Sequence, residues 1–176
     1  FRLAFERHEL RIVAINDLGD LENLAYLLKH DSVYRDFNHK VSADVKSKKL
    51  IIDNQRIDFY QEKDPTRLLW HKLGIDVVVE STGFFETFES ASAHLKAGAK
   101  RVVISAPAKD DDESLKLGAT VLLGVNEKDM AKVKITSDGS CTTNAVAPVV
   151  AVLSEKPGIK KAVLNTIHAY TATQRV

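Results

Sequence analysis

Short runs of Val and Ile that end in turns of small or polar residues place the tightest constraint on the fold. Three such runs lie at 11–15, 75–80 and 100–104. Uninterrupted apolar runs of this length are typical of strands buried on both faces of a parallel sheet. Segments with helical periodicity follow the first two, at 20–29 and 87–96. This alternation predicts an α/β fold built on a doubly wound parallel sheet.

A different pattern separates the first two runs. Short alternating segments at 41–45, 49–52 and 57–60, with the turn pair Asp53-Asn54 between two of them, predict a small antiparallel insertion. Two further strands are expected before the cysteine, at 120–126 and 133–136. We expect Asn126 to cap a short helix at 127–131 between them.

The composition of this 176-residue chain excludes several classes of partner. A formal net charge of +1 gives no electrostatic reason to expect nucleic acid or a membrane surface. No apolar run approaches the ~20 residues of a transmembrane helix, and no signal-peptide pattern opens the chain. One cysteine excludes an internal disulfide framework and fits a reducing compartment, so we expect a cytoplasmic location. The acidic run at 110–113 is interpreted as a solvated loop, and no metal site is expected.

The single cysteine, Cys141, lies between an expected strand end and an apolar run at 145–153 that predicts a buried helix. Ser140 has the chemistry of an N-cap. The thiol is therefore expected in the first turn of the helix, where unpaired N–H groups and the helix dipole favour an anion. A thiolate there is a better nucleophile than a free cysteine. The alternative is a buried structural cysteine, the commoner role for a lone Cys, but the neighbouring hydroxyl and amide side chains favour the nucleophile.

His168 is the histidine most closely associated with this chemistry. It ends an alternating run at 162–168 that predicts a strand, and Tyr170, Thr171 and Thr173 follow it with hydroxyl groups. The other five histidines lie in mixed polar surroundings, where surface roles suffice. Taken alone, His168 is more simply interpreted as structural or surface-exposed. A candidate nucleophile in the same expected domain makes a Cys–His pair the better interpretation.

Asp17 follows the first predicted strand. An acidic residue in that place commonly binds the adenine ribose hydroxyls in dinucleotide folds, and its charge favours NAD over NADP. The spacing is equally compatible with a plain helix cap or turn residue.

Several motifs together resemble the phosphorylating glyceraldehyde-3-phosphate dehydrogenase family. The segment Ser140-Cys141-Thr142-Thr143-Asn144, followed by Ala147-Pro148, is similar to the active-site signature of that family. The segment beginning at His168 and ending at Gln174 is similar to its catalytic histidine segment. Four further motifs match in family order, and the resemblance runs from Phe1 to Val176; these motifs are Asn16-Asp17, Glu62-Lys63-Asp64-Pro65, Glu80-Ser81-Thr82-Gly83 and Ile104-Ser105-Ala106-Pro107.

The resemblance implies a role for each matching residue. Cys141 and His168 are expected to be catalytic. Ser140, Thr142 and Thr171 are expected to bind the substrate or inorganic phosphate. The residues expected to bind NAD are Asn16, Asp17, Lys63, Ser81, Thr82, Gly83 and Ser105.

The resemblance also implies a Rossmann-like sheet followed by the start of an α+β catalytic domain. Residues 1–139 would form the NAD-binding domain and 140–176 the beginning of the catalytic domain. No Gly-x-Gly-x-x-Gly occurs in the chain, and the family carries a first strand and such a turn just before the point matching Phe1. We therefore expect a fragment of a chain about twice as long, inactive by itself and tetrameric when intact.

The implied reaction is the NAD-dependent oxidative phosphorylation of glyceraldehyde 3-phosphate to 1,3-bisphosphoglycerate, a step of glycolysis. A Cys141 thiohemiacetal and then a thioester would be the intermediates. A relative acting on erythrose 4-phosphate, or a non-phosphorylating aldehyde dehydrogenase, would keep the same Cys and His. A cysteine hydrolase, or an inactive binding fragment, also remains open.

Overall fold

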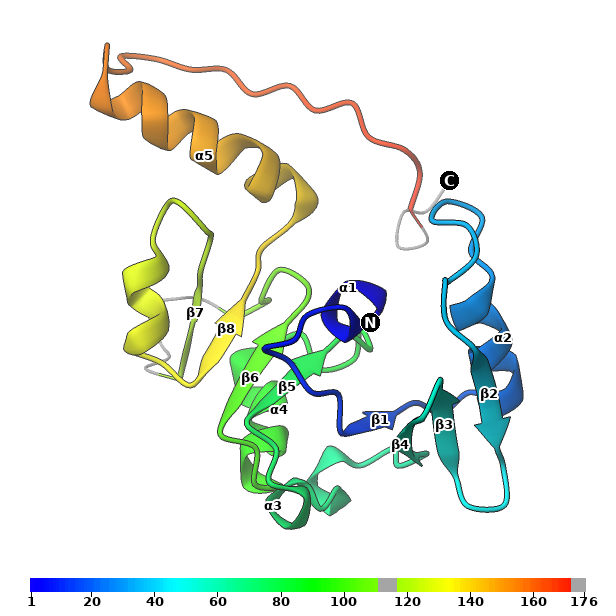
Figure 1. The fold of residues 1–176 in the computed structure, drawn as a ribbon. Coiled ribbons are helices and arrows are strands. Elements are labelled where there is room, and N and C mark those ends of the chain that lie inside the picture. The colour runs from blue at the N-terminus through cyan, green and yellow to red at the C-terminus, as the bar shows by residue number, and fades with distance from the viewer. Residues whose placement is uncertain (111–116, 172–176) are drawn as a thin grey trace. The chain divides into compact units, whose positions relative to one another are not determined.

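The computed structural model describes residues 1–110 and 117–171. The chain divides into two units, and Figure 1 labels the helices and strands of both. The first unit holds Phe1–Ile75 and Lys96–Ala99. The second unit holds Asp76–Leu95 and the chain from Lys100 onward.

The first unit is built on a mixed sheet with strand order β1-β4-β3-β2. β1 (Ala14–Asn16) pairs in parallel with β4 (Gln55–Tyr60), whereas β3 (Lys49–Ile52) is antiparallel to both β4 and β2 (Val41–Asp44). The predicted antiparallel insertion is therefore confirmed, with its turn at Asp53-Asn54.

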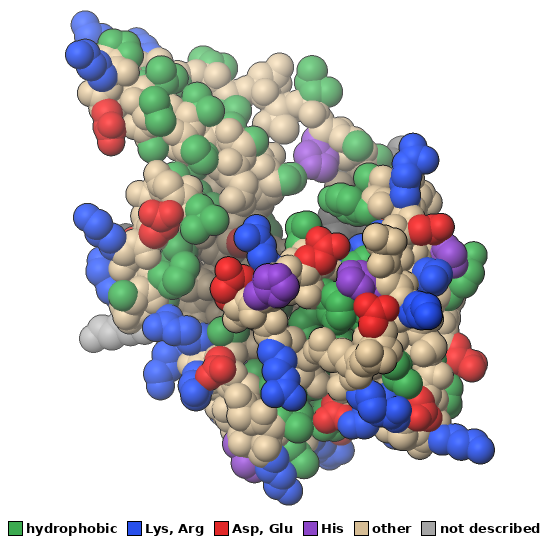
Figure 2. Space-filling model, viewed as in Figure 1, with side chains coloured by type: hydrophobic (Ala, Val, Ile, Leu, Met, Phe, Trp, Pro, Cys, Tyr) green, Lys and Arg blue, Asp and Glu red, His purple; other side chains and the backbone are tan. Residues whose placement is uncertain are grey.

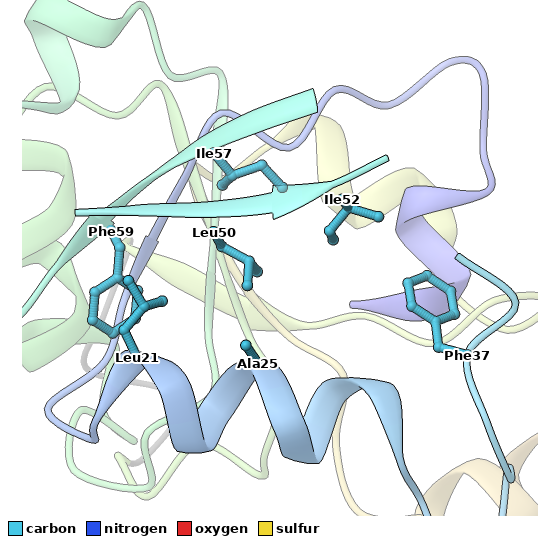
Figure 3. Close-up of a cluster of buried hydrophobic side chains, with 7 residues drawn as sticks. All are labelled: Leu21, Ala25, Phe37, Leu50, Ile52, Ile57 and Phe59. Carbon is cyan, nitrogen blue, oxygen red and sulfur yellow. The ribbon is translucent and has the colours of Figure 1, made fainter. Parts of the chain in front are cut away.

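Helix α2 (Leu21–Lys29) covers this sheet because its apolar face matches the strand residues beneath it. It begins where predicted: Asp20 is the N-cap, and its carboxylate accepts a hydrogen bond from the Asn23 N–H at 2.8 Å. Figure 3 shows the core between helix and sheet, formed by seven buried side chains: Leu21, Ala25, Phe37, Leu50, Ile52, Ile57 and Phe59.

The second unit is built on a parallel sheet with strand order β5-β6-β8-β7. Its strands are β5 (Val77–Glu80), β6 (Arg101–Ile104), β7 (Gly118–Thr120) and β8 (Ile135–Ser137). The register aligns their carboxyl ends: Glu80 lies opposite Ile104, and Ile104 lies opposite Ser137. The parallel strands and the helices that follow them confirm the predicted α/β class.

Helix α4 (Phe88–Lys96) contributes Phe88 and Ala91 to the core of the second unit, where they join Val102, Ile104 and Ile135. Asp110 satisfies the start of this helix from a distant loop, because its carboxylate accepts hydrogen bonds from the N–H groups of Phe88 (2.8 Å) and Glu89 (3.3 Å). The rest of the acidic run falls outside the described residues.

The remaining helices are short, except for α5 (Cys141–Glu155). None of the 15 residues of α5 is buried, and Figure 2 shows hydrophobic side chains at the surface over this helix. The short elements are α1 (Arg2–Phe5), η1 (Pro65–Arg67), α3 (Trp70–Leu73) and η2 (Glu127–Ala131). Within the two described ranges, no helix has the length and apolar character needed to cross a membrane.

The strand predicted at 162–168 is wrong. Residues 159–171 form no regular secondary structure, and Val163 and Ile167 are almost fully exposed. A strand needs a neighbour for its backbone N–H and C=O groups, and this segment pairs with none of the described strands. Alternation of apolar residues therefore indicates a segment that can form a strand, but it does not show whether a neighbouring strand is present to pair with it.

The predicted side-chain cap from Asn126 is also wrong. Asn126 does occupy the N-cap position of η2, but its side chain makes no cap hydrogen bond. Its amide instead accepts from the Leu122 N–H at 2.8 Å and donates to the Thr120 carbonyl at 2.9 Å. Asn126 therefore closes the loop after β7 rather than the start of the helix.

Two glycines of the first unit differ in their surroundings although both have positive φ. Gly74 ends α3 with φ +64°, and a Cβ built there has no neighbour within 4 Å. Gly98 has φ +104°, and a Cβ built there would lie 2.5 Å from the His71 Cβ and 2.7 Å from the His71 N. The main chain around Gly98 is held in place, because the His71 N–H donates to the Ala97 carbonyl at 3.1 Å.

We predict that Gly98→Ala lowers the free energy of unfolding by about 2–4 kcal/mol, since backbone strain and a steric clash add together. The matched control Gly74→Ala is expected to cost about 1 kcal/mol, because only backbone strain applies. Urea denaturation of the two variants measures the difference. Equal losses would contradict the close approach at Gly98.

Candidate active site

Cys141 occupies the first position of α5, after an N-cap built as the sequence predicts. The Ser140 hydroxyl accepts a hydrogen bond from the Thr143 N–H at 3.0 Å and lies 2.7 Å from the Thr143 hydroxyl. The Asn144 side chain donates to the carbonyls of Asp138 (2.6 Å) and Ser140 (2.9 Å). The turn before the helix is thereby tied to its first turn, so the backbone around the thiol is held in place. Cys141 is exposed, which rules out a buried structural cysteine.

His168 lies beside this thiol in the second unit. Its Nε2 is 3.2 Å from the Cys141 Sγ, and its Nδ1 is 2.6 Å from the Ala169 carbonyl oxygen. A carbonyl only accepts, so Nδ1 carries the hydrogen of that bond. Nε2 is then the atom that can take the proton of the thiol and return it.

Each member of the pair favours the charged form of the other. The pKa of Cys141 is lowered, first by the hydrogen bond from His168 and further by the N–H and hydroxyl of Thr142. The pKa of His168 is raised, first by the Ala169 carbonyl and then by Cys141. The arrangement therefore favours a thiolate–imidazolium pair, which is an activated nucleophile with its acid–base partner in contact.

A second group of predicted site residues follows β5 and β6 at the carboxyl edge of the parallel sheet. The Ser105 hydroxyl lies 3.0 Å from the Ser81 hydroxyl and donates to the Glu80 carbonyl at 3.2 Å. The Thr82 N–H donates to the Glu80 carboxylate at 2.7 Å. The structure thus brings Ser81, Thr82 and Ser105 together, with Gly83 next to them.

Two more predicted residues end β1 in the first unit. The Asn16 side chain forms two 2.9 Å hydrogen bonds with the backbone of Glu62, so it joins the exits of β1 and β4. Asp17 is exposed, and its Oδ1 accepts from the Gly19 N–H at 2.7 Å. The other carboxylate oxygen is available to a ligand hydroxyl. Lys63 and, in the second unit, Thr171 are exposed.

The residues present fit NAD by the chemistry of their donors and acceptors. Asp17 offers a carboxylate at a strand end, as adenine ribose hydroxyls require. In the second unit Ser81 and Ser105 offer hydroxyl groups, and a Cβ built at Gly83 has nothing within 4 Å, so the backbone there is open to close approach. Among the residues that the structure describes, no three His, Cys, Asp or Glu side chains form a group that could hold a metal ion.

One buried pair was not predicted from the sequence. His94 was expected at the surface, but it is buried on α4, with its Nε2 2.8 Å from the Glu80 Oε2. A signal was present: Phe88, Ala91 and His94 are spaced three residues apart, which places them on one helix face, and both apolar members are buried. The identity of its partner could not be obtained from helical spacing.

The parallel α/β sheet, together with a thiol paired to an imidazole, defines the class: a dinucleotide-fold protein that carries a nucleophilic cysteine. Comparison with known families agrees. Residues 1–88 match the family model "glyceraldehyde 3-phosphate dehydrogenase, NAD binding domain", and residues 140–176 match the model of the C-terminal domain of the same family. The chain belongs to the glyceraldehyde 3-phosphate dehydrogenase family.

Curated relatives carry the same family name. The glyceraldehyde-3-phosphate dehydrogenase of Serratia odorifera is 47% identical over 175 residues, covering 99% of this chain and 57% of the relative. The Thermotoga maritima protein of that name is 47% identical over 179 residues, covering 100% of this chain and 51% of the relative. The Mycoplasma pneumoniae protein is 48% identical over 177 residues, covering 100% of this chain and 50% of the relative. The chain thus spans about half the length of the curated relatives it matches.

We predict that the pH profile of Cys141 alkylation depends on His168. In the unchanged chain the midpoint is expected below the ~8.5 of free cysteine, because the imidazolium stabilises the thiolate. His168→Ala should move the midpoint upward and slow alkylation at pH 7. Iodoacetamide kinetics between pH 5 and 10 measure the shift.

The matched control for this experiment is His30→Ala, since His30 belongs to the first unit and pairs with Asp36 at 2.7 Å. It should leave the alkylation profile unchanged. Identical profiles for all three proteins would show that His168 does not act on the thiol.

We also predict that Ser140→Ala loosens the first turn of α5. Loss of an N-cap costs about 1 kcal/mol, equivalent to about fivefold faster amide hydrogen exchange at Thr143. Ser154→Ala is the control, because Ser154 belongs to the same helix but its hydroxyl donates to the Val150 carbonyl at the other end. An equal effect of the two variants on Thr143 would argue against the cap.

Proposed function

We propose that the protein catalyses the NAD-dependent oxidative phosphorylation of glyceraldehyde 3-phosphate to 1,3-bisphosphoglycerate. The observation that carries this proposal is the 3.2 Å contact between the Cys141 Sγ and the His168 Nε2, in a chain of this family. The overall step oxidises an aldehyde and joins the resulting acyl group to phosphate. Its place would be glycolysis, in the cytoplasm.

The first task of the pair is to form a covalent bond to the aldehyde. Nε2 of His168 takes the thiol proton, and the Cys141 thiolate attacks the carbonyl carbon. The carbonyl oxygen gains the electron pair of the broken π bond. Protonated His168 can then donate to that oxygen, which gives a thiohemiacetal. The N–H groups at the start of α5 favour the negative charge throughout.

Bound NAD would supply the hydride acceptor that the oxidation requires. Cys141 would hold the acyl carbon as a thiohemiacetal before the oxidation and as a thioester after it. His168 removes the hydroxyl proton as the C–H bond breaks. Inorganic phosphate then attacks the thioester carbon; its oxygen forms the new bond, and the thiolate of Cys141 leaves with the electron pair. The product is an acyl phosphate, and the pair returns to its starting state.

We assign the remaining residues by their position and chemistry. Ser140, Thr142 and Thr171 would bind the substrate or inorganic phosphate through hydroxyl and backbone N–H groups. Residues 1–139 would form the NAD-binding domain, with Asp17 at the adenine ribose and Asn16, Lys63, Ser81, Thr82, Gly83 and Ser105 around the cofactor. Residues 140–176 would begin the catalytic domain, and the intact protein would be a homotetramer.

The test is NADH formation by the intact polypeptide from glyceraldehyde 3-phosphate and inorganic phosphate. Cys141→Ser should abolish it, because no covalent intermediate can form. His168→Asn should slow it by ~10²–10⁴-fold, the usual range for a lost acid–base group. Full activity of Cys141→Ser would end the covalent mechanism.

Omitting one reactant separates the rival functions. NADH formed at an unchanged rate without phosphate would indicate a non-phosphorylating aldehyde dehydrogenase. A higher kcat/KM with erythrose 4-phosphate than with glyceraldehyde 3-phosphate would indicate that erythrose 4-phosphate is the substrate. Ester cleavage without any NADH would indicate a cysteine hydrolase, and the absence of all three reactions would leave a binding role.

A further inference from the structure

Glu80 and His94 form a buried hydrogen-bonded pair beneath the carboxyl edge of the parallel sheet. Glu80 is the last residue of β5 and His94 belongs to α4; each is 4% exposed. Their contact, between the His94 Nε2 and the Glu80 Oε2, is 2.8 Å long. Burying a carboxylate costs free energy unless it is paired and hydrogen-bonded. Both oxygens of Glu80 therefore need hydrogen-bond partners.

The second oxygen of Glu80 is used by the turn that follows the strand. Oε1 accepts hydrogen bonds from both the N–H (2.7 Å) and the hydroxyl of Thr82. The Thr82 Oγ1 in turn accepts from the Phe84 N–H at 3.2 Å. Thr82 and its neighbours in the turn are exposed, so a buried carboxylate holds an exposed turn from below.

The backbone of Glu80 joins the same turn to the end of the next strand. Its carbonyl accepts from the Ser105 N–H at 2.9 Å and from the Ser105 hydroxyl at 3.2 Å. That hydroxyl also lies 3.0 Å from the hydroxyl of Ser81. One residue, Glu80, is therefore bonded to Thr82 and Ser105, and through Ser105 it fixes Ser81.

The charge of this carboxylate is maintained against its burial. Desolvation raises the pKa of Glu80, but the hydrogen bonds from His94 and Thr82 together outweigh it, and the pKa lies below its ordinary value. Glu80 is thus a carboxylate at neutral pH, able only to accept. Thr82 must then donate to it, and its N–H and hydroxyl are both oriented inward.

We propose that Glu80 and His94 are positioning residues of the NAD site: His94 holds the Glu80 carboxylate, and the carboxylate holds Ser81, Thr82 and Ser105 in the geometry that receives the cofactor. This inference rests on the proposed function, since it assigns these three residues to NAD. The benefit is preorganisation, because a turn that is already ordered loses less conformational entropy when the cofactor binds.

The test uses the intact polypeptide and two readouts, the Kd for NAD and steady-state kinetics. In the double variant Glu80→Met/His94→Leu, apolar side chains of similar volume replace the pair, a change that buried pairs often tolerate. We expect the Kd and the KM for NAD to rise about tenfold, as for the loss of one or two hydrogen bonds. The loss should fall on KM rather than on kcat.

Two single variants accompany it. Glu80→Gln keeps an acceptor for Thr82 and a polar contact to His94, so it should restore NAD binding to within about threefold of wild type. Asp76→Asn is the matched control, because Asp76 is an exposed carboxylate just before the same strand, 2.6 Å from the Lys100 Nζ. It should leave both readouts unchanged.

The outcomes distinguish the inference from the proposed function. If the wild-type protein binds no NAD, the proposed function fails. If wild type binds NAD and the double variant binds it equally well, only the positioning role fails. A fall in kcat and stability without a change in the Kd would mean that the pair serves the fold alone. Should the double variant not fold, Thr82→Val and Thr82→Ser decide: Val should weaken NAD binding and Ser should preserve it, and equal Kd values overturn the proposal.

Discussion

The register of one parallel sheet determines where the chemistry of the second unit can lie. Because Glu80, Ile104 and Ser137 lie side by side, the chain leaves three strands at the same level of one sheet edge. The segments that follow are the 81–83 turn, Ser105 and the turn that leads into α5. A shift of one residue in any strand would turn alternate side chains to the opposite face. The predicted cofactor residues Ser81, Thr82, Gly83 and Ser105 and the start of the cysteine helix therefore depend on the same ladder of backbone hydrogen bonds.

Buried polar side chains carry this order from the strands to the loops. Ser137 is fully buried, and its hydroxyl donates to the Ala106 carbonyl at 2.7 Å while accepting from the Gly139 N–H at 3.1 Å. It thereby joins the loop after β6 to the turn before Cys141. Glu80 likewise joins the turn after β5 to Ser105 after β6. Burying polar side chains such as Ser137 and Glu80 costs desolvation free energy. In this sheet these side chains connect the segments that follow neighbouring strands.

The Cys141–His168 pair is held in place by fewer structural contacts than the residues at the sheet edge. Ser140 and Asn144 fix the first turn of α5, but His168 lies in an exposed segment without regular secondary structure. The two residues are 27 positions apart, and the 3.2 Å contact between the Cys141 Sγ and the His168 Nε2 joins them. The Cys141–His168 contact lies at the surface, whereas the Glu80–His94 hydrogen bond is buried.

The sequence alone determined the local features, because these depend on neighbours along the chain. Hydrophobic periodicity placed α2 and α4 nearly to the residue, and the capping chemistry of Ser140 located the start of α5. The order of the motifs identified the family. Tertiary structure decided whatever depends on a distant partner. The residues at 162–168 alternate like a strand but have no neighbouring strand, and Asn126 bonds to Leu122 and Thr120 instead of capping its helix. His94 is buried because Glu80 lies opposite it. The spacing of residues along a chain does not show whether a strand will find a neighbouring strand, or whether a buried carboxylate will find a hydrogen-bond partner.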